Sequence, residues 1–310
     1  METEYEVSTT IQSKKKANFS RIIKNKMLLC GLGVLCVMAI ISVFAPLIAT
    51  YSPLEINPVN RLQPPSVEHI FGTDEFGRDL FSRVIYGTRI SFFIGTAVAL
   101  IAGLIGMTIG LVSAYFRFLD HILMRIIDGV YAFPSILLAL AIVAVRGPNV
   151  FNVLIALVIV YIPSIARVVR AAALVVKEQT FIEALIAQGA SKWRILVIHT
   201  IPNILSQLII QVTFVFAVAI ITEASLSFLG AGIPAPNPSL GNILFDGKNV
   251  IYNSWWMTVF PGAFIILLVL GLNTVGDGLR DLMDPKIVNV KRKKRKRLKR
   301  NVGGEQHGHR

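Results

Sequence analysis

Two long stretches of this chain contain no charged side chain, and they restrict the possible folds more than any other feature. Residues Met27–Ala49 and Ile90–Phe116 lack Asp, Glu, Lys and Arg altogether. A helix rises about 1.5 Å per residue, so about 20 apolar residues cross a hydrocarbon core about 30 Å thick. Both stretches are long enough. Apolar residues make up 54% of the chain, which leaves too little polar surface to cover a water-soluble core.

The same pattern continues along the chain and predicts an all-α membrane protein with six transmembrane helices. The basic residues before the first apolar run are similar to those of a signal peptide. That run is longer than usual in such peptides and no A-x-A-like cleavage site follows it, so we expect a retained anchor. The predicted spans are residues 27–49, 90–116, 123–145, 150–172, 203–228 and 255–277.

Positive charge indicates the orientation of these spans. Residues 11–26 carry several Lys and Arg and no acidic residue, and residues 291–300 read KRKKRKRLKR. Cytoplasmic segments next to membrane spans are enriched in Lys and Arg. Both termini are therefore predicted to be cytoplasmic, in agreement with an even number of spans. Segments 117–122 and 177–202 then face the cytoplasm, and segments 50–88 and 229–254 face outside.

The predicted organisation has four parts. They are a basic segment (1–26), a first span with its outer loop (27–88), a five-helix core (89–286) and a basic tail (287–310). Each cation near an anionic lipid surface contributes about 1 kcal/mol of attraction, so we expect both basic segments to contact lipid headgroups. Basic runs also bind nucleic acid, but this tail adjoins a span, and no nucleic-acid partner is predicted.

The sequence carries no convincing catalytic or metal-binding pattern. It has no H-E-x-x-H, C-x-x-C or G-x-S-x-G motif. The stretch Gly241–Asn249 has one residue too many between its glycines for a phosphate-binding loop and lacks the final Ser or Thr. Cys30 and Cys36 lie six residues apart, so on a helix they point in different directions. We therefore expect no catalytic site, metal or cofactor on this chain.

Two carboxylates fall inside predicted spans. A carboxylate at the centre of a bilayer costs about 2.5–3.5 kcal/mol on insertion scales, so it should face the bundle interior and have a partner. Asp128 lies one helical turn from Arg125, which favours a local pair, whereas Glu223 has no nearby cation. Both are candidates for a cargo path or a gate, with a structural role as the alternative.

Small residues and prolines recur within the spans. Small residues spaced four apart let helix backbones approach closely in lipid, and a proline removes one helical hydrogen bond and favours a kink. Pro134, Pro163 and Pro261 therefore predict kinks. Close helix packing is predicted at Gly95, Ala99, Gly103, Gly106 and Gly110.

The outer segments carry two further features. Residues 73–79 have the pattern of a short capped helix. Trp255 and Trp256 are expected near the lipid headgroups, where such rings are enriched, with a docking surface or gate as the alternative.

The polar segment 177–202 lies between two apolar runs and predicts a short helix. Thr180 and Glu183 have the spacing of a capping box, and Gly189 suits the left-handed position that ends a helix. A short amphipathic helix at this place either lies in the lipid interface or binds a groove on a soluble partner. Local physics does not separate these two uses.

A family resemblance favours the second use. Glu183-Ala184-Leu185, Gly189 and Ile201-Pro202 resemble the EAA loop of permease subunits of ATP-binding-cassette importers, with Leu185 in place of the third small residue. Four other stretches look like the C-type subunit of the dipeptide, oligopeptide and nickel branch, and together the matches span residues 27–286. These stretches are Phe71–Asp79, Ala132–Ser135, Glu223–Gly230 and Gly276–Asp281.

The resemblance implies a fold like that of type I ABC importer permeases and a set of partners. These are a similar second permease subunit, two cytoplasmic ATPases that bind ATP and Mg²⁺, and an external solute-binding protein. Peptides are the expected cargo, with nickel or a metal chelate as the alternative. A more distant alternative is an ion-coupled secondary transporter that uses Asp128 and Glu223. The residues implied to couple to the ATPases are Phe181, Ile182, Glu183, Ala184, Leu185, Ile186 and Gly189.

Overall fold

The computed structural model describes residues 25–283, so the predictions for the basic tail and for residues 1–24 lie outside the described residues. Helices dominate the described part. They are α2 (Lys26–Val43), α3 (Ala45–Ile48), η1 (Pro58–Asn60), α4 (Leu80–Tyr115), α5 (Arg117–Tyr131), α6 (Ser135–Arg146), α7 (Val150–Lys177), α8 (Thr180–Ala187), α9 (Lys192–Arg194), η2 (Ile195–Thr200), α10 (Ile201–Phe228), α11 (Leu240–Gly247) and α12 (Trp256–Met283).

Five helices within residues 25–283 are long and apolar enough to cross a membrane. Four of them are α2, α4, α7 and α12, and the fifth is a continuous helix over Lys192–Phe228 that contains α9, the π-helical turn η2 and α10. A bent pair, α5 and α6, brings the count to six if it forms one span. The predicted six-helix membrane fold is therefore confirmed, with one span of unexpected shape.

The third span is broken rather than kinked. Helices α5 and α6 meet at 90°, and Pro134 is the N-cap of α6, with extended backbone angles of φ −55° and ψ 128°. Proline lacks an N–H and disfavours helical geometry in the residue before it, so α5 ends just upstream. The span predicted over residues 123–145, with a kink at Pro134, is therefore two separate helices on either side of this proline. Pro163 and Pro261 do lie inside continuous helices.

Two helix boundaries also differ from the predictions. Helix α4 begins at Leu80, inside the predicted outer loop 50–88, because Asp79 caps it: the Asp79 carboxylate accepts a hydrogen bond from the Ser82 backbone N–H at 2.8 Å. The predicted inner loop 117–122 instead forms the first turns of α5. Charged residues in the first turns of a helix lower the local hydropathy. An apolar run therefore begins later than the helix that contains it, as at α4 and α5.

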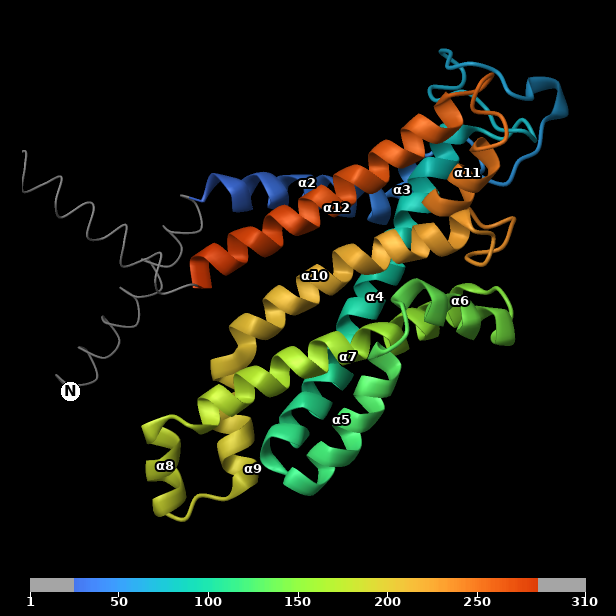
Figure 1. Cartoon of the computed structure of the whole chain (residues 1–310). Helices are drawn as coiled ribbons and strands as arrows, with labels where there is room; N and C mark the ends of the chain where they lie inside the picture. The colour runs from blue at the N-terminus through green and yellow to red at the C-terminus, as the bar shows by residue number, and fades with distance from the viewer. Residues whose placement is uncertain (1–24, 284–310) are drawn as a thin grey trace, which may run out of the picture.

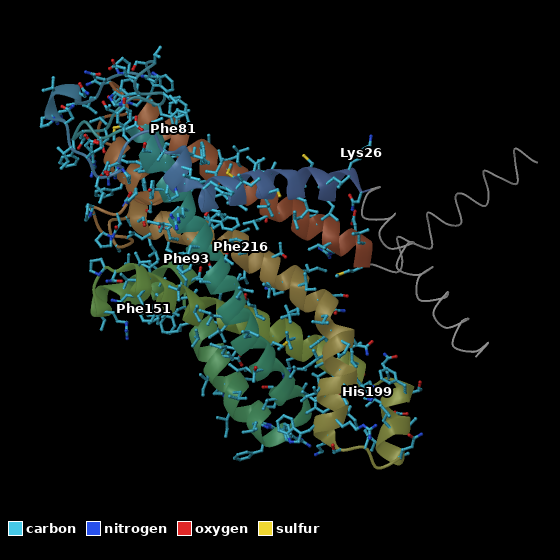
Figure 2. The ribbon with its side chains drawn as sticks, turned by 180° about the vertical axis from the view of Figure 1, so that it is seen from behind. Lys26, Phe81, Phe93, Phe151, His199 and Phe216 are labelled. Carbon is cyan, nitrogen blue, oxygen red and sulfur yellow. The ribbon has the colours of Figure 1, made fainter. Side chains whose placement is uncertain are left out.

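The connecting segments gather at two ends of the bundle (Figure 1). Helix α8 and both ends of the described chain lie at one end, and the loop before α4 lies with α11 at the other. Figure 2 shows the same polarity, with Lys26 and His199 far from Phe81. The two chain ends also touch, since the Asn25 side-chain amide donates to the Gly278 carbonyl oxygen at 3.4 Å.

The interior consists of two apolar clusters that share α4 and α10. The first lies mainly between α4, α7 and α10, and the second between α2, α4, α10, α11 and α12. Fully buried members of the first are Ile94, Leu157, Ile165, Ile204 and Leu226, and of the second Leu80, Ile220, Leu240, Met257 and Leu268.

Small residues on α4 allow these close contacts, as predicted. Gly106 and Gly110 face α7, and Gly95 and Gly103 face α10. A Cβ atom at Gly110 would lie 2.6 Å from a backbone carbonyl oxygen of α7, and one at Gly95 would lie 2.7 Å from side-chain carbons of α10. Helix α4 thus holds its two neighbours at distances that only glycine permits.

Gly110→Val is therefore expected to lower the free energy of unfolding by about 2–3 kcal/mol, because the backbone of α7 cannot yield as a flexible side chain would. The measurement is the thermal unfolding midpoint of the purified protein in detergent. Gly33→Val is the matched control, since nothing lies within 4 Å of a Cβ atom at Gly33. Equal midpoints for the two variants would contradict the predicted packing role.

Candidate functional site

The polar segment 177–202 folds into α8 and a following reversal of the chain. Gln179, not Thr180, is the N-cap of α8, and no side chain caps the helix. The Gln179 carbonyl oxygen accepts hydrogen bonds from the backbone N–H groups of Ile182 at 2.9 Å and Glu183 at 3.3 Å. The predicted capping box is therefore wrong, because the helix starts one residue earlier than that motif requires.

The far end of α8 has the predicted left-handed glycine. Gly189 has a φ of +79°. Its N–H donates to the Ile186 carbonyl oxygen at 2.9 Å, and the Ala190 N–H donates to the Leu185 carbonyl oxygen at 3.0 Å. This pair of bonds is the Schellman motif, and it ends the helix in a fixed turn. Nothing lies within 4 Å of a Cβ atom at Gly189. Glycine is therefore favoured at this position by its backbone conformation and not by a lack of space.

The two sides of α8 differ in exposure. Ile182 is fully buried in the first apolar cluster, and Leu185 packs against that cluster while half-buried. Phe181, Ala184 and Ile186 are exposed. Ile182 therefore anchors α8 to its own chain and is not part of the exposed surface that sequence reasoning assigned to it. The large apolar candidates that remain exposed for contact with a partner are Phe181 and Ile186, five residues apart on α8.

The residues before and after α8 both form hydrogen bonds with the end of α4. The Lys177 ammonium donates to the Ala114 carbonyl oxygen at 3.1 Å. On the other side of α8, the Tyr115 hydroxyl and the Thr200 hydroxyl hydrogen-bond at 2.6 Å. Thr200 closes the π-helical turn that leads into α10. These two hydrogen bonds attach the α8 segment to α4 in addition to its covalent links to α7 and α10.

Helices α5 and α7 carry two ion pairs. Arg170 donates to both oxygens of Asp120, at 2.6 and 2.7 Å. Arg167 donates to Asp128 at 2.6 Å, and its guanidinium carbon lies 4.2 Å from the centroid of the Tyr131 ring. The predicted local pair between Asp128 and Arg125 is wrong. The partner comes from the neighbouring helix because α5 packs alongside α7.

Glu223 lies fully buried between α4 and α10. It accepts hydrogen bonds from the Ser91 hydroxyl at 2.8 Å and from the Ser227 hydroxyl at 2.9 Å. Its partners among the described residues are therefore hydroxyl groups rather than a cation. Glu223 has no exposed surface in this conformation, and its assignment to a path or gate stays a prediction.

The opposite end of the bundle holds a second group of charges, which we call the outer charge cluster (Asp74, Arg78, Arg83 and Asp246). Asp74 is buried, and its Oδ2 lies 2.6 Å from Arg78 Nε and 3.3 Å from Arg83 Nε. Its Oδ1 accepts from the backbone N–H groups of Phe76 and Arg78. The carboxylate thus closes residues 73–79 into a tight turn, and the predicted short helix there is wrong.

Trp256 fixes this turn to α12. Its indole N–H donates to the Thr73 carbonyl oxygen at 3.2 Å, and the ring is buried. The adjacent Asp79 carboxylate lies 2.9 Å from His69 Nδ1. Trp256 is therefore a structural anchor rather than the interfacial ring that was expected, whereas Trp255 is exposed.

Asp246 on α11 gives the outer charge cluster a pH dependence. Burial raises the pKa of its carboxyl above the ordinary 3.8, and the Arg83 and Arg78 guanidinium groups offset only part of that rise. The folded protein thus binds this proton more tightly than the unfolded chain does. The contribution of Asp246 to the free energy of unfolding is therefore largest at low pH and falls as the pH rises from 3.8 through the raised pKa.

Asp246→Asn is expected to remove this slope in the thermal midpoint from about pH 3.8 upward, because the amide does not titrate. The measurement is thermal unfolding of both proteins across that range. Glu68→Gln, at an exposed loop position, is the control and should keep the slope. An unchanged slope in the Asp246 variant would contradict the assignment.

Comparison with known families and structures agrees with this architecture. Residues 106–289 match the family described as "Binding-protein-dependent transport system inner membrane component". Residues 16–65 match the "N-terminal TM domain of oligopeptide transport permease C". The first match alone covers more than half of the chain.

Individual relatives agree. The dipeptide transport system permease protein DppC of Alkalihalophilus pseudofirmus is 45% identical over 90% of this chain and 92% of its own length. The oligopeptide transport system permease protein OppC of Bacillus subtilis is 38% identical over 86% and 88%. A solved chain of the MetNI methionine ABC transporter shares the fold, with a TM-score of 0.56 and 21% identity over 66% of this chain and 98% of that chain.

Membrane helices, a short helix at one end of the bundle and these matches all lead to one assignment. The chain belongs to the binding-protein-dependent transport system inner membrane components, the multi-pass permease subunits of ABC transporters in the inner membrane.

Proposed function

We propose that this chain is one permease subunit of an ATP-driven importer that receives di- or oligopeptides from a solute-binding protein. The observation that carries the proposal is α8, a short helix whose apolar Phe181 and Ile186 remain exposed while Ile182 anchors it. Two large apolar side chains on so short a helix fit a groove on a soluble partner. The peptide cargo rests on the names of the relatives, which are dipeptide and oligopeptide permeases.

The partners follow from the two ends of the bundle. The end that carries α8 and both ends of the described chain faces the cytoplasm and contacts two ATPases, which bind ATP and Mg²⁺. The end that carries the outer charge cluster faces the solute-binding protein. A second, similar permease subunit completes the path across the membrane.

Coupling works through differential contacts in two states. Closure of the ATPases on ATP displaces α8. The hydrogen bonds from Lys177 to Ala114 and between Tyr115 and Thr200 transmit that displacement to the spans. The transporter then shifts its population between inward- and outward-open states, as any two-state system does when one ligand binds the two states unequally.

Crosslinking in the purified complex tests the proposal. Ile186→Cys, in a background with Cys30 and Cys36 replaced by Ser, is expected to crosslink to an ATPase subunit in a complex that imports peptide. Val67→Cys is the control, because Val67 is fully exposed on the loop before α4. A functional complex in which residue 186 never reaches an ATPase would refute the coupling role.

Reconstituted uptake separates the alternatives. ATP-driven dipeptide uptake that requires the solute-binding protein supports the proposal. Uptake of nickel but not of peptide would favour the metal-import branch. Uptake that stops when ion gradients collapse, with ATP still present, would favour a secondary transporter.

A further inference from the structure

A charged surface on α5 and α7 lies outside the bundle interior, and we call it the α5–α7 charged face (Arg125, Asp128, Tyr131 and Arg167). The Asp128 and Arg167 side chains are 55% and 42% exposed although they bind each other at 2.6 Å. Tyr131, under the Arg167 guanidinium, is 53% exposed. Arg125 is exposed and has no carboxylate partner within residues 25–283.

The charged face lies level with the charge-free run of α4, which we take to cross the membrane. On α7, the residues next to Arg167 pack against Gly106 and Gly110 of α4. The charge-free run of α4 continues from Gly110 to Phe116, about 9 Å further at 1.5 Å per residue. A charge that faces lipid at such depth is costly, and intramembrane ionisable residues almost always face the bundle interior or a water-filled cavity.

The break between α5 and α6 supports the same conclusion independently of charge. Residues 131–135 connect two helices at 90°, and every one of them is exposed. Irregular backbone at membrane depth leaves N–H and C=O groups without helical partners. It is tolerated only where protein covers it or where it lines a water-filled cavity. Tyr131 belongs to both features, so the break and the ion pair share one surface.

We infer that the α5–α7 charged face lines the water-filled cargo path, and that Arg167 and Asp128 bind the carboxylate and the ammonium of a peptide. This inference rests on the proposed function and adds a binding site to it. Contacts between membrane helices are built from small residues, as on α4, whereas this face presents exposed charges of both signs. A zwitterionic peptide needs both. Without cargo the two side chains neutralise each other, so binding exchanges one ion pair for two and stays weak enough for release.

Thiol labelling tests the water-filled surface. The variant is Phe133→Cys, at a 62% exposed position of the break, in the complete complex with Cys30 and Cys36 replaced by Ser. A charged, membrane-impermeant thiosulfonate is expected to label it at least about tenfold faster than Ile266→Cys, because thiolates form only in water. Ile266 on α12 is similarly exposed, at 58%, but lies within an apolar stretch of that helix. An unreactive thiol at position 133 in every nucleotide state would mean that lipid or the second permease covers the break, and would overturn the inference.

Protection of the thiol at position 133 tests the ligand. Alanyl-alanine is expected to slow the labelling, and Arg167→Gln should raise the concentration for half-protection about tenfold, the effect of losing one charge-assisted hydrogen bond. The same variant should not raise that concentration for alanyl-alanine amide, which lacks the carboxylate. Arg146→Gln, at the exposed end of α6, is the matched control. Absence of protection, or an equal shift for both peptides, would overturn the site.

Uptake by the wild-type complex is measured in parallel. If the wild-type complex shows no ATP-driven peptide uptake, the proposed function is refuted. Normal uptake without protection of the thiol at position 133 refutes the binding site alone.

Discussion

A complex that carries Ala184→Arg is expected to insert into the membrane normally and to import peptide at least about 100-fold more slowly than wild type. Ala184 is exposed and lies one helical turn after the exposed Phe181, on the same face of α8. An unpaired charge buried in an interface costs about 2–5 kcal/mol, and each 1.4 kcal/mol is a factor of ten in binding. The measurements are peptide uptake and the amount of ATPase that co-purifies with the permease.

Two further variants define the result. Val67→Arg places the same charge at a fully exposed position on the other end of the bundle and should leave uptake unchanged. Gly189→Pro should reproduce the defect, because proline cannot adopt the φ of +79° found at Gly189. Normal uptake by Ala184→Arg with a full complement of ATPase would show that α8 is not buried against a partner.

The second large effect is on stability. Arg83→Met is expected to lower the free energy of unfolding by about 3 kcal/mol, because the carboxylates of Asp74 and Asp246 then share the single guanidinium of Arg78. Arg83 is buried beside Asp74, which has almost no exposed surface to recover hydration. The measurement is the thermal midpoint of the purified protein in detergent.

Arg61→Met is the matched control for this experiment, since Arg61 lies on the loop before α4 but is exposed and forms no ion pair within residues 25–283. Its midpoint should stay within about 0.5 kcal/mol of wild type in equivalent free energy. A midpoint for Arg83→Met as high as that of the control would contradict a structural role for the outer charge cluster.

The spans were predictable because hydropathy is a local property of the sequence. Charge-free runs predicted α2 and α4, and small residues on α4 predicted its close contacts. A kink was predicted at Pro134, but its size, a 90° break between two separate helices, was not, because a proline alone does not fix the angle between the segments that it separates. Its sequence, Ala132–Ser135, did contribute to the family resemblance, and that was the available indication.

Partners across helices were not predictable from spacing alone. Asp128 has a cation one turn away, yet it binds Arg167 from another helix. Helix spacing gives neighbours on one helix but not the rotation of one helix against another. The same limit applies to Ile182, whose burial depends on how α8 folds back on the bundle. The function was easier to predict from the sequence than the side-chain contacts, because the EAA-like pattern lies within one continuous segment.

The continuous helix Lys192–Phe228 is about 55 Å long at 1.5 Å per residue, which is longer than the hydrocarbon core of a membrane. It starts just after the turn that ends α8, and its far end holds Glu223 in the hydroxyl groups of two serines. The π-helical turn Ile195–Thr200 interrupts the α-helical geometry near the start of this helix. Deletion of one residue there would rotate the part of the helix beyond the turn by about 100° against the part before it, so the turn sets which side chains of α10 face α4 and α7.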